Sequence, residues 1–263
     1  MENEILRILP QTVRAVLLHT PESRIEELRL RVGQKPSVLY AGCEQILNAG
    51  GVLTQNELQQ VLLNASAQSQ YAVQEQLRNG YLSLPGGYRI GVCGSTVVQN
   101  GCITGIREIS SIALRVPHDI RQPPERLLPY LQESCLLAGA PGSGKTTLLR
   151  SCIRTLSDVG QRVAVVDERQ ELSGAVHGVP QFDLGPRTDV LSGCPKGDGM
   201  LMLLRSMNPQ WIAVDEITQP EDIMALRQAG SCGVKLIATI HAGSAEELKN
   251  KPLCRKLFSL GIF

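Results

Sequence analysis

Eight consecutive residues in the middle of the chain have the composition and spacing of a phosphate-binding loop. The segment GAPGSGKT fits the pattern G-x-x-x-x-G-K-[ST], and Thr147 follows it. Its residues are Gly139, Ala140, Pro141, Gly142, Ser143, Gly144, Lys145 and Thr146. Glycines let the backbone wrap a triphosphate, and the helix that follows adds free N–H donors. Lys145 can reach the β and γ phosphates, and the Thr146 hydroxyl can bind Mg²⁺.

A match by chance is the alternative to this interpretation. Average composition gives a random match to the four fixed positions about once in a hundred chains of this length. Here the match also lies between an apolar strand and a helix, as phosphate binding requires. The sequence therefore predicts ATP and Mg²⁺ as cofactors. A GTPase is disfavoured, because no N-K-x-D motif for reading guanine follows the loop.

A second segment, WIAVDE, ends in two carboxylates, Asp215 and Glu216. Strands of an α/β sheet present ligand groups at their carboxyl ends. We expect Asp215 to hold the magnesium shell through water and Glu216 to orient or deprotonate the attacking water. A single acidic pair at a strand end is often just solvated. The phosphate loop earlier in the same domain favours the functional interpretation.

Two further strands end in polar residues. RVAVVDE ends in Asp167 and Glu168, which we predict to be a second metal ligand and a second catalytic carboxylate. KLIATIH ends in His241, at the position expected of a γ-phosphate sensor. A lone histidine is more often structural or merely exposed, and that alternative stays open for His241.

Apolar strands alternate with helices around these motifs. Strands are expected at 134–139, 162–168, 211–216 and 235–241, and helices at 144–158, 197–207 and 220–230. This alternation indicates an α/β fold with a mainly parallel sheet covered on both faces, here a RecA-like P-loop domain.

A smaller α+β domain is expected to precede the P-loop domain. Its elements are a helix at 3–18 that Pro10 must start or kink, a hairpin of EELRLRV and PSVLY, helices at 53–66 and 68–78, and short strands separated by Gly-Gly and Asn-Gly turns. Thr54 and Glu57 have the spacing of a capping box. Pro117, Pro123 and Pro124 indicate a linker, so the predicted domains are 1–117 and 118–263.

Composition lowers the expectation for several other classes of protein. The 26 basic and 25 acidic residues give a net charge of +1, and aromatic residues make up 3% of the chain, so nucleic acid is not an expected partner. The eight cysteines lack the close pairs of a zinc site. No apolar run approaches the roughly 20 residues needed to cross a bilayer. A cytosolic protein with reduced thiols is predicted.

The four motifs, in this order, resemble those of the type II/IV secretion and pilus-retraction ATPases, which carry a phosphate loop, an acidic box, a magnesium strand and a histidine box. The segments GIREISSIALRVP, VVDERQEL, IATIHAGS and the long block from GVPQFDLGPRTDV to WIAVDEI are very similar to the stage III sporulation AA family within that superfamily. The sequence differs from the usual pattern of these ATPases in two places. Asp215-Glu216 replaces the usual Gly-Glu, and the chain ends at LGIF where the family continues into a further strand, so a truncated C-terminus is one interpretation.

The resemblance implies a cytosolic homo-oligomeric ATPase, a hexamer by analogy, that converts hydrolysis into domain motion during endospore formation. It implies membrane-embedded sporulation or secretion complex proteins as partners, and attachment to the membrane through them without direct insertion. Arg107 and Arg115 flank the last strand of the first domain, which in related hexamers supplies arginines to a neighbouring site. Arg169, Arg187 and Arg205 are further candidates. A nucleic-acid-dependent ATPase and a nucleotide-gated scaffold with little turnover remain the alternatives.

Overall fold

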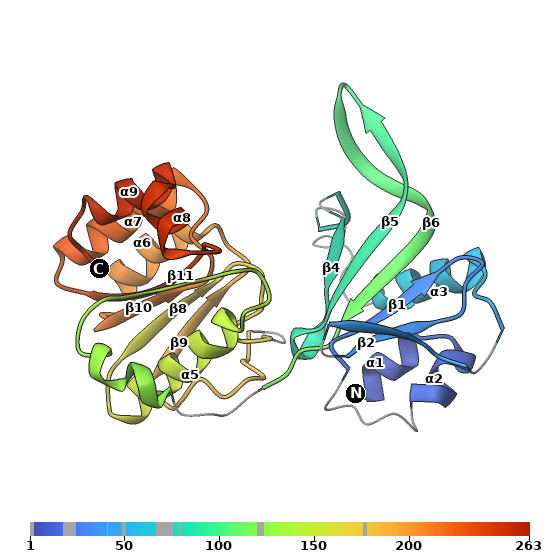
Figure 1. Cartoon of the computed structure of the whole chain (residues 1–263), viewed down its shortest axis with the longest axis horizontal. Helices are drawn as coiled ribbons and strands as arrows, with labels where there is room; N and C mark the ends of the chain where they lie inside the picture. The colour runs from blue at the N-terminus through green and yellow to red at the C-terminus, as the bar shows by residue number, and fades with distance from the viewer. Residues whose placement is uncertain are drawn as a thin grey trace. The chain divides into compact units, whose positions relative to one another are not determined.

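The computed structural model describes residues 3–17, 25–40, 42–48, 51–66, 76–78, 80–119, 124–175 and 178–263. The chain forms two compact units, Met1–His118 and Asp119–Phe263, and each is described by itself (Figure 1). Among the described residues, no helix combines the length and apolar character needed to cross a membrane.

The first unit is an antiparallel sheet with helices packed on it. Its strands are β1 (Glu27–Arg31), β2 (Ser37–Tyr40), β3 (Cys43–Ile46), β4 (Tyr81–Ser83), β5 (Arg89–Gln99) and β6 (Cys102–Arg115), in the order β3-β2-β1-β6-β5-β4. Its helices are α1 (Asn3–Ile8), α2 (Gln11–Leu17), α3 (Gln55–Ser66) and the 3₁₀ turn η2 (Pro85–Gly87). Alternate strand residues such as Leu28, Leu30 and Ile112 are buried beneath the helices.

Two local sequence signals of the first unit are confirmed, whereas most of the short strands expected after residue 80 are joined into two long strands, β5 and β6. Pro10 separates α1 from α2, and its carbonyl oxygen accepts from the Arg14 N–H at 3.0 Å. The capping box forms, because the Glu57 N–H donates to Thr54 Oγ1 at 3.2 Å and the Thr54 N–H donates to Glu57 Oε2 at 2.8 Å. The helix expected at 68–78 lies largely outside the described residues.

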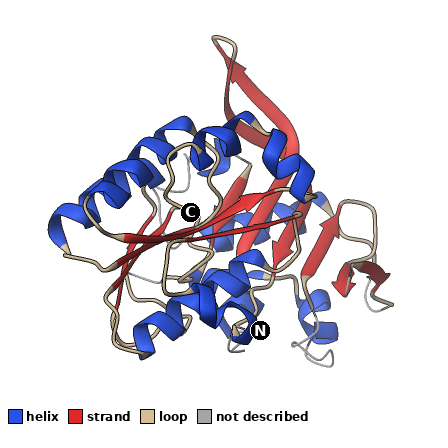
Figure 2. Ribbon diagram, turned by 60° about the vertical axis from the view of Figure 1, so that its left-hand side comes forward, coloured by secondary structure: helices blue, strands red, loops and turns tan. Residues whose placement is uncertain are grey.

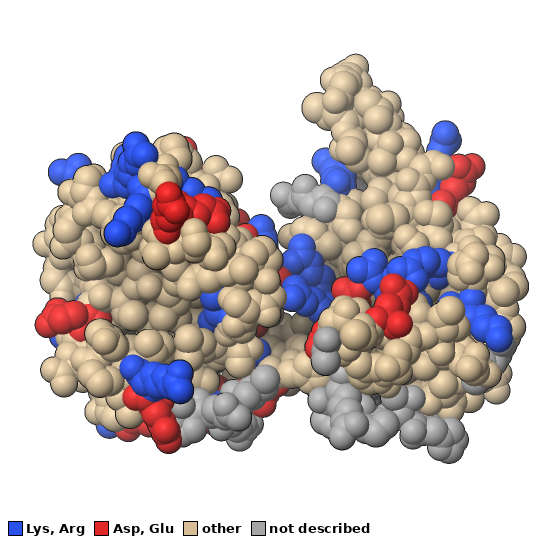
Figure 3. Space-filling view, in the orientation of Figure 1, with Lys and Arg blue, Asp and Glu red and all other residues tan. Residues whose placement is uncertain are grey.

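The β5–β6 hairpin extends beyond the rest of its sheet (Figure 1). β4 pairs with the start of β5, and β1 with the end of β6, so no described strand pairs with either edge of the far half of the hairpin. Residues 94–106 include no charged side chain, and Figure 3 shows this projection without Lys, Arg, Asp or Glu at its end.

The second unit is a parallel α/β sheet. Its strands are β7 (Cys135–Gly139), β8 (Val163–Asp167), β9 (Thr188–Ser192), β10 (Trp211–Val214) and β11 (Lys235–His241), in the order β7-β11-β10-β8-β9, all parallel. Its helices are α5 (Lys145–Asp158), α6 (Lys196–Ser206), α7 (Pro220–Ser231), α8 (Ala245–Asn250), α9 (Pro252–Phe258) and the 3₁₀ helix η3 (Glu125–Tyr130). This is the α/β class expected from the sequence, with one strand, β9, that the pattern does not predict.

Helices cover both faces of this sheet (Figure 2). Side chains on successive strand residues point to opposite faces. Val163 and Val165 pack with α5, whereas Ala164 and Val166 pack with α6 and α7. Because all five strands run in the same direction, the residues that end β7, β8, β10 and β11 meet at one edge of the sheet, where the motifs lie.

Candidate functional site

The phosphate loop connects β7 to α5 and is shaped by its glycines. Gly142 and Gly144 have φ values of 74° and 85°, in the left-handed region that favours glycine. A Cβ on Gly139 would lie 2.7 Å from Ser143 Oγ, so no larger residue fits there without movement. The Lys145 ammonium folds back over the loop and donates to the Ala140 carbonyl oxygen at 2.7 Å. The cation is thus held at the loop itself, within reach of a phosphate bound there.

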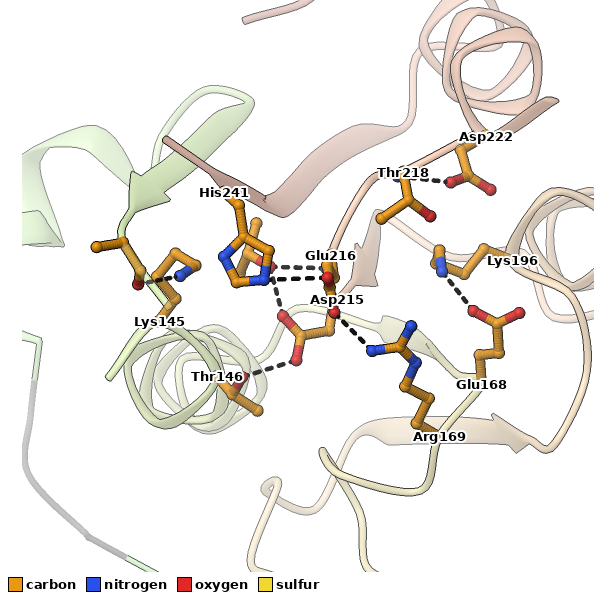
Figure 4. Close-up of polar contacts among 12 residues, drawn as sticks. Lys145, Thr146, Glu168, Arg169, Lys196, Asp215, Glu216, Thr218, Asp222 and His241 are labelled. Atoms are coloured by element: carbon orange, nitrogen blue, oxygen red, sulfur yellow. Dashed lines mark hydrogen bonds and ion pairs between the residues drawn. The ribbon is translucent and has the colours of Figure 1, made fainter. Parts of the chain in front are cut away.

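A chain of hydrogen bonds joins the phosphate loop to the ends of two strands (Figure 4). The Thr146 hydroxyl donates to Asp215 Oδ2 at 2.8 Å, and the Thr239 hydroxyl donates to Asp215 Oδ1. The Thr239 oxygen also accepts from the Glu216 N–H at 2.7 Å. The structure therefore brings Thr146, Asp215 and Glu216 together, as the motifs predict, and adds Thr239, a buried hydroxyl between the apolar residues Ala238 and Ile240 of β11.

Glu216 lies between two potential cations. Its Oε1 is 3.0 Å from His241 Nε2, and its Oε2 accepts from the Arg169 guanidinium at 2.8 Å. Its φ of 54° is left-handed, which costs a non-glycine residue about 1–3 kcal/mol and tends to occur at functional sites. Beyond it, Asp222 accepts from the N–H groups of Thr218 and Gln219 at 3.1 Å each and fixes the start of α7.

The Asp167 carboxylate is bonded to the turn that follows it in the sequence. Its oxygens accept from the Leu172 N–H at 3.1 Å, the Ser173 N–H at 2.7 Å and the Ser173 hydroxyl at 2.6 Å. Burial raises the pKa of Asp167, and these hydrogen bonds oppose that rise. Both oxygens are occupied by groups that stabilise the turn, so the geometry favours a structural role over the metal-ligand role expected from the sequence.

Glu168 and Lys196 form an ion pair next to Glu216. The Lys196 side chain is only 6% exposed, and that of Glu168 is 38% exposed. Both residues line a pocket at the carboxyl edge of the sheet. Its lining residues are Val166, Asp167, Glu168, Arg169, Glu171, Lys196, Asp215 and Glu216. The sequence motifs did not indicate Lys196, which lies on a helix and is brought to this edge by the fold.

The candidate arginines are dispersed. Arg187 stabilises a turn, since its guanidinium donates to the Gly160 carbonyl oxygen at 2.7 Å. Arg205 is exposed in the last turn of α6. Arg107 and Arg115 are exposed on β6 of the first unit. Of the five candidates, Arg169 is the one that the structure joins to the carboxylates of the second unit.

The oxygen donors of this edge fit Mg²⁺. Among the described residues, no group of three His, Cys, Asp or Glu side chains is arranged around a metal position. Mg²⁺ is usually held by one or two carboxylates together with substrate phosphates and water. A hydroxyl and a carboxylate at 2.8 Å from each other beside a phosphate loop, Thr146 and Asp215, supply such a donor set.

The chain is similar in sequence to proteins already known. The chain is 36% identical over 269 residues to the stage III sporulation protein AA of Bacillus subtilis (strain 168), covering 97% of this chain and 87% of that protein. It is 27% identical over 125 residues to a putative type II secretion system protein E of Escherichia coli (strain K12), covering 48% and 24% of the two chains.

Solved structures show the same fold. The pilus retraction motor PilT with bound ADP superposes with a TM-score of 0.61 at 18% identity, over 97% of this chain and 73% of that chain. The ATPase DotB of Legionella pneumophila gives a TM-score of 0.60 at 20% identity, over 96% and 71%. The sequence model described as "Sporulation stage III, protein AA" matches residues 1–263. The chain therefore belongs to the sporulation stage III protein AA family and has the fold of the type II/IV secretion ATPases.

Proposed function

We propose that this chain binds ATP with Mg²⁺ at the GAPGSGKT loop and hydrolyses it. The observation that carries the proposal is the hydrogen-bonded chain from Thr146 through Asp215 and Thr239 to Glu216. It connects the end of the phosphate loop to a carboxylate that can act on water. The left-handed conformation of Glu216, beside His241 and Arg169, supports a catalytic role for this carboxylate.

Each residue of the site has a distinct task in this proposal. Lys145 exchanges the Ala140 carbonyl oxygen for oxygens of the β and γ phosphates. Thr146 and Asp215 hold Mg²⁺, which when bound offsets the negative charge on the phosphates. Glu216 orients the attacking water and accepts its proton. His241, which contacts Glu216, lies where it can respond to the γ phosphate.

We further propose that hydrolysis drives conformational work in a membrane-associated complex during endospore formation, and that the working form is an oligomer, a hexamer by analogy. Membership of the sporulation family supports the setting. The shared fold with a pilus retraction motor and with DotB supports mechanical work. The partners in this proposal are membrane-embedded sporulation proteins.

Calorimetry of ATP binding and a phosphate-release assay, each with and without Mg²⁺, test the activity. Wild-type protein should bind ATP and release phosphate, and Lys145→Ala should lose most of its affinity because a cation on the β and γ phosphates is removed. Lys256→Ala, an exposed lysine of α9, is the matched control and should behave as wild type.

Three results would contradict the proposal. Undiminished ATP binding by Lys145→Ala would reject the phosphate-loop assignment. Tight binding without phosphate release would indicate a nucleotide-gated scaffold. Turnover that appears only after DNA or RNA is added would indicate the nucleic-acid-dependent alternative.

A further inference from the structure

Lys196 is a buried cation beside the candidate site, and none of the motifs accounts for it. It is the first residue of α6, and its side chain is 6% exposed. Lysine is seldom this buried unless it is paired, because removing an ammonium from water is costly. A cation in the first turn of a helix also opposes the helix dipole. Neither helix formation nor solvation explains its placement.

Its partner is one oxygen of Glu168. The Lys196 ammonium donates to Glu168 Oε2, and within the described part of the chain no hydrogen bond involves Oε1. Both side chains line the pocket that also contains Asp215 and Glu216 (Figure 4). Lys196 therefore fixes the carboxylate at one oxygen and leaves the other able to accept from water in that pocket.

The sequence around Lys196 brings it close to β8. A Cβ on Gly199 would lie 2.7 Å from Val166 Cγ1 and 2.8 Å from Cys194 Sγ, so the first turns of α6 lie directly against the strand. Val166 lies near the end of that strand, and Glu168 directly follows its last residue, Asp167. A larger residue at position 199 would push α6, and with it Lys196, away from Glu168.

The charges that line the pocket also favour the Lys196–Glu168 ion pair. The carboxylates of Asp167, Glu168, Asp215 and Glu216 line one small space, so negative charge is concentrated there. Arg169 pairs with Glu216, and Lys196 pairs with Glu168. Each of the two candidate catalytic carboxylates therefore has its own cation.

We propose that Lys196 is a positioning residue for hydrolysis, which holds Glu168 so that its free oxygen accepts a hydrogen bond from water beside Glu216. This inference rests on the proposed ATPase function. It assigns Lys196 no contact with nucleotide, so its effect is on turnover and not on ATP binding.

A double-mutant cycle with Lys196→Met, Glu168→Gln and the combined variant tests the assignment, with kcat, KM and ATP affinity measured for each protein. Lys196→Met should lower kcat by up to about 100-fold, the scale expected when a catalytic group is misplaced by about an ångström. ATP affinity should stay within about twofold of wild type, because the phosphate loop is untouched. Adding Lys196→Met to Glu168→Gln should cause little further loss.

Two control variants separate positioning from simple structural support. Lys196→Arg keeps a cation and should restore most of the turnover lost in Lys196→Met. Lys256→Met, at an exposed position of α9, should leave kcat unchanged. If Lys196→Met does not fold, Lys196→Gln, which keeps a donor but no charge, replaces it in the same cycle.

Three outcomes overturn the inference. The first is an unchanged kcat in Lys196→Met. The second is a fall in kcat, on adding Lys196→Met to Glu168→Gln, that is as large as the fall it causes in the wild-type protein. The third is an affinity loss that accounts for the whole effect. If the wild-type protein binds ATP but does not hydrolyse it, both the proposed function and this inference are wrong. If the wild-type protein hydrolyses ATP and Lys196→Met does so equally fast, only this inference is wrong.

Discussion

Glu216 is held by contacts to both of its carboxylate oxygens and to its backbone N–H. Its two oxygens are engaged by His241 and by Arg169, and its backbone is held in a left-handed conformation by the Thr239 hydroxyl and the turn before α7. These contacts hold the carboxylate at the edge of the sheet before nucleotide arrives. A carboxylate has about four acceptor sites, so Glu216 can accept a hydrogen bond from water without losing these contacts.

Replacing Glu216 by Gln should separate binding from chemistry. Glutamine has the same shape and can keep a hydrogen bond to its neighbours, but it cannot accept the proton of water. We expect nearly normal ATP affinity by calorimetry and phosphate release slowed at least about 100-fold. Glu133→Gln, an exposed glutamate outside the site, is the control. Full turnover by Glu216→Gln with loss of turnover in Glu168→Gln would move the role of base to Glu168.

Single residues were predictable where a motif fixes both type and spacing. The loop glycines, Lys145, Thr146 and the Asp215-Glu216 pair could be named from the sequence, and the structure brings the last three together. Thr239 and Lys196 could not, because each acts through a partner on another element. Asp167 has the same sequence signature as Asp215, and only the Ser173 turn directs its carboxylate elsewhere.

Elements were predictable where apolar periodicity is strong. The buried strands β8, β10 and β11 and the helices α5, α6 and α7 all lie within a few residues of their expected ranges. β9 was missed because TDVLS is polar, short and only partly buried at the edge of the sheet, so it lacks both an apolar run and a clear alternation. Its pairing with β8, not its own sequence, makes it a strand.

Because α6 packs closely on β8, a larger residue at position 199 should destabilise this part of the fold. Gly199→Ala should destabilise the second unit by about 1–3 kcal/mol, because the added methyl meets Val166 and Cys194 at 2.7 and 2.8 Å. Gly197→Ala is the matched control in the same helix, where the nearest atom to an added Cβ is 3.4 Å away. Denaturant unfolding measures both variants, and equal stability of the two would show that α6 accommodates the methyl by moving.

At the scale of the whole chain, the sequence indicated a boundary at the proline-rich segment, and the two compact units divide between His118 and Asp119. The phosphate loop and all four motif strands belong to the second unit, whereas Arg107 and Arg115 belong to the first. Sequence cannot place one unit against another, because that arrangement depends on contacts between surfaces that carry no periodic signal.

The two arginines of β6 cannot serve the same phosphate. They lie opposite Ser95 and Arg89 of β5, which are six residues apart, or roughly 20 Å at about 3.3 Å per residue. If the first unit of one subunit completes the site of its neighbour, one of the two arginines should therefore be essential and the other dispensable. An arginine supplied by a neighbouring subunit can contribute about 10³–10⁵ in rate, so the difference between Arg107→Ala and Arg115→Ala should be large.

Shared sites also make turnover depend on assembly. Specific activity should rise steeply with protein concentration, in step with the oligomer seen by analytical ultracentrifugation. Lys145→Ala subunits lack the phosphate contact but carry both arginines, so mixing them with the inactive arginine variant should recover part of the turnover. Activity per subunit that stays constant down to concentrations where the protein is monomeric would reject the shared site. If mixing the two variants restores no turnover, that result alone is weaker evidence against a shared site. A ring in which every site must act in turn is stopped by any inactive subunit.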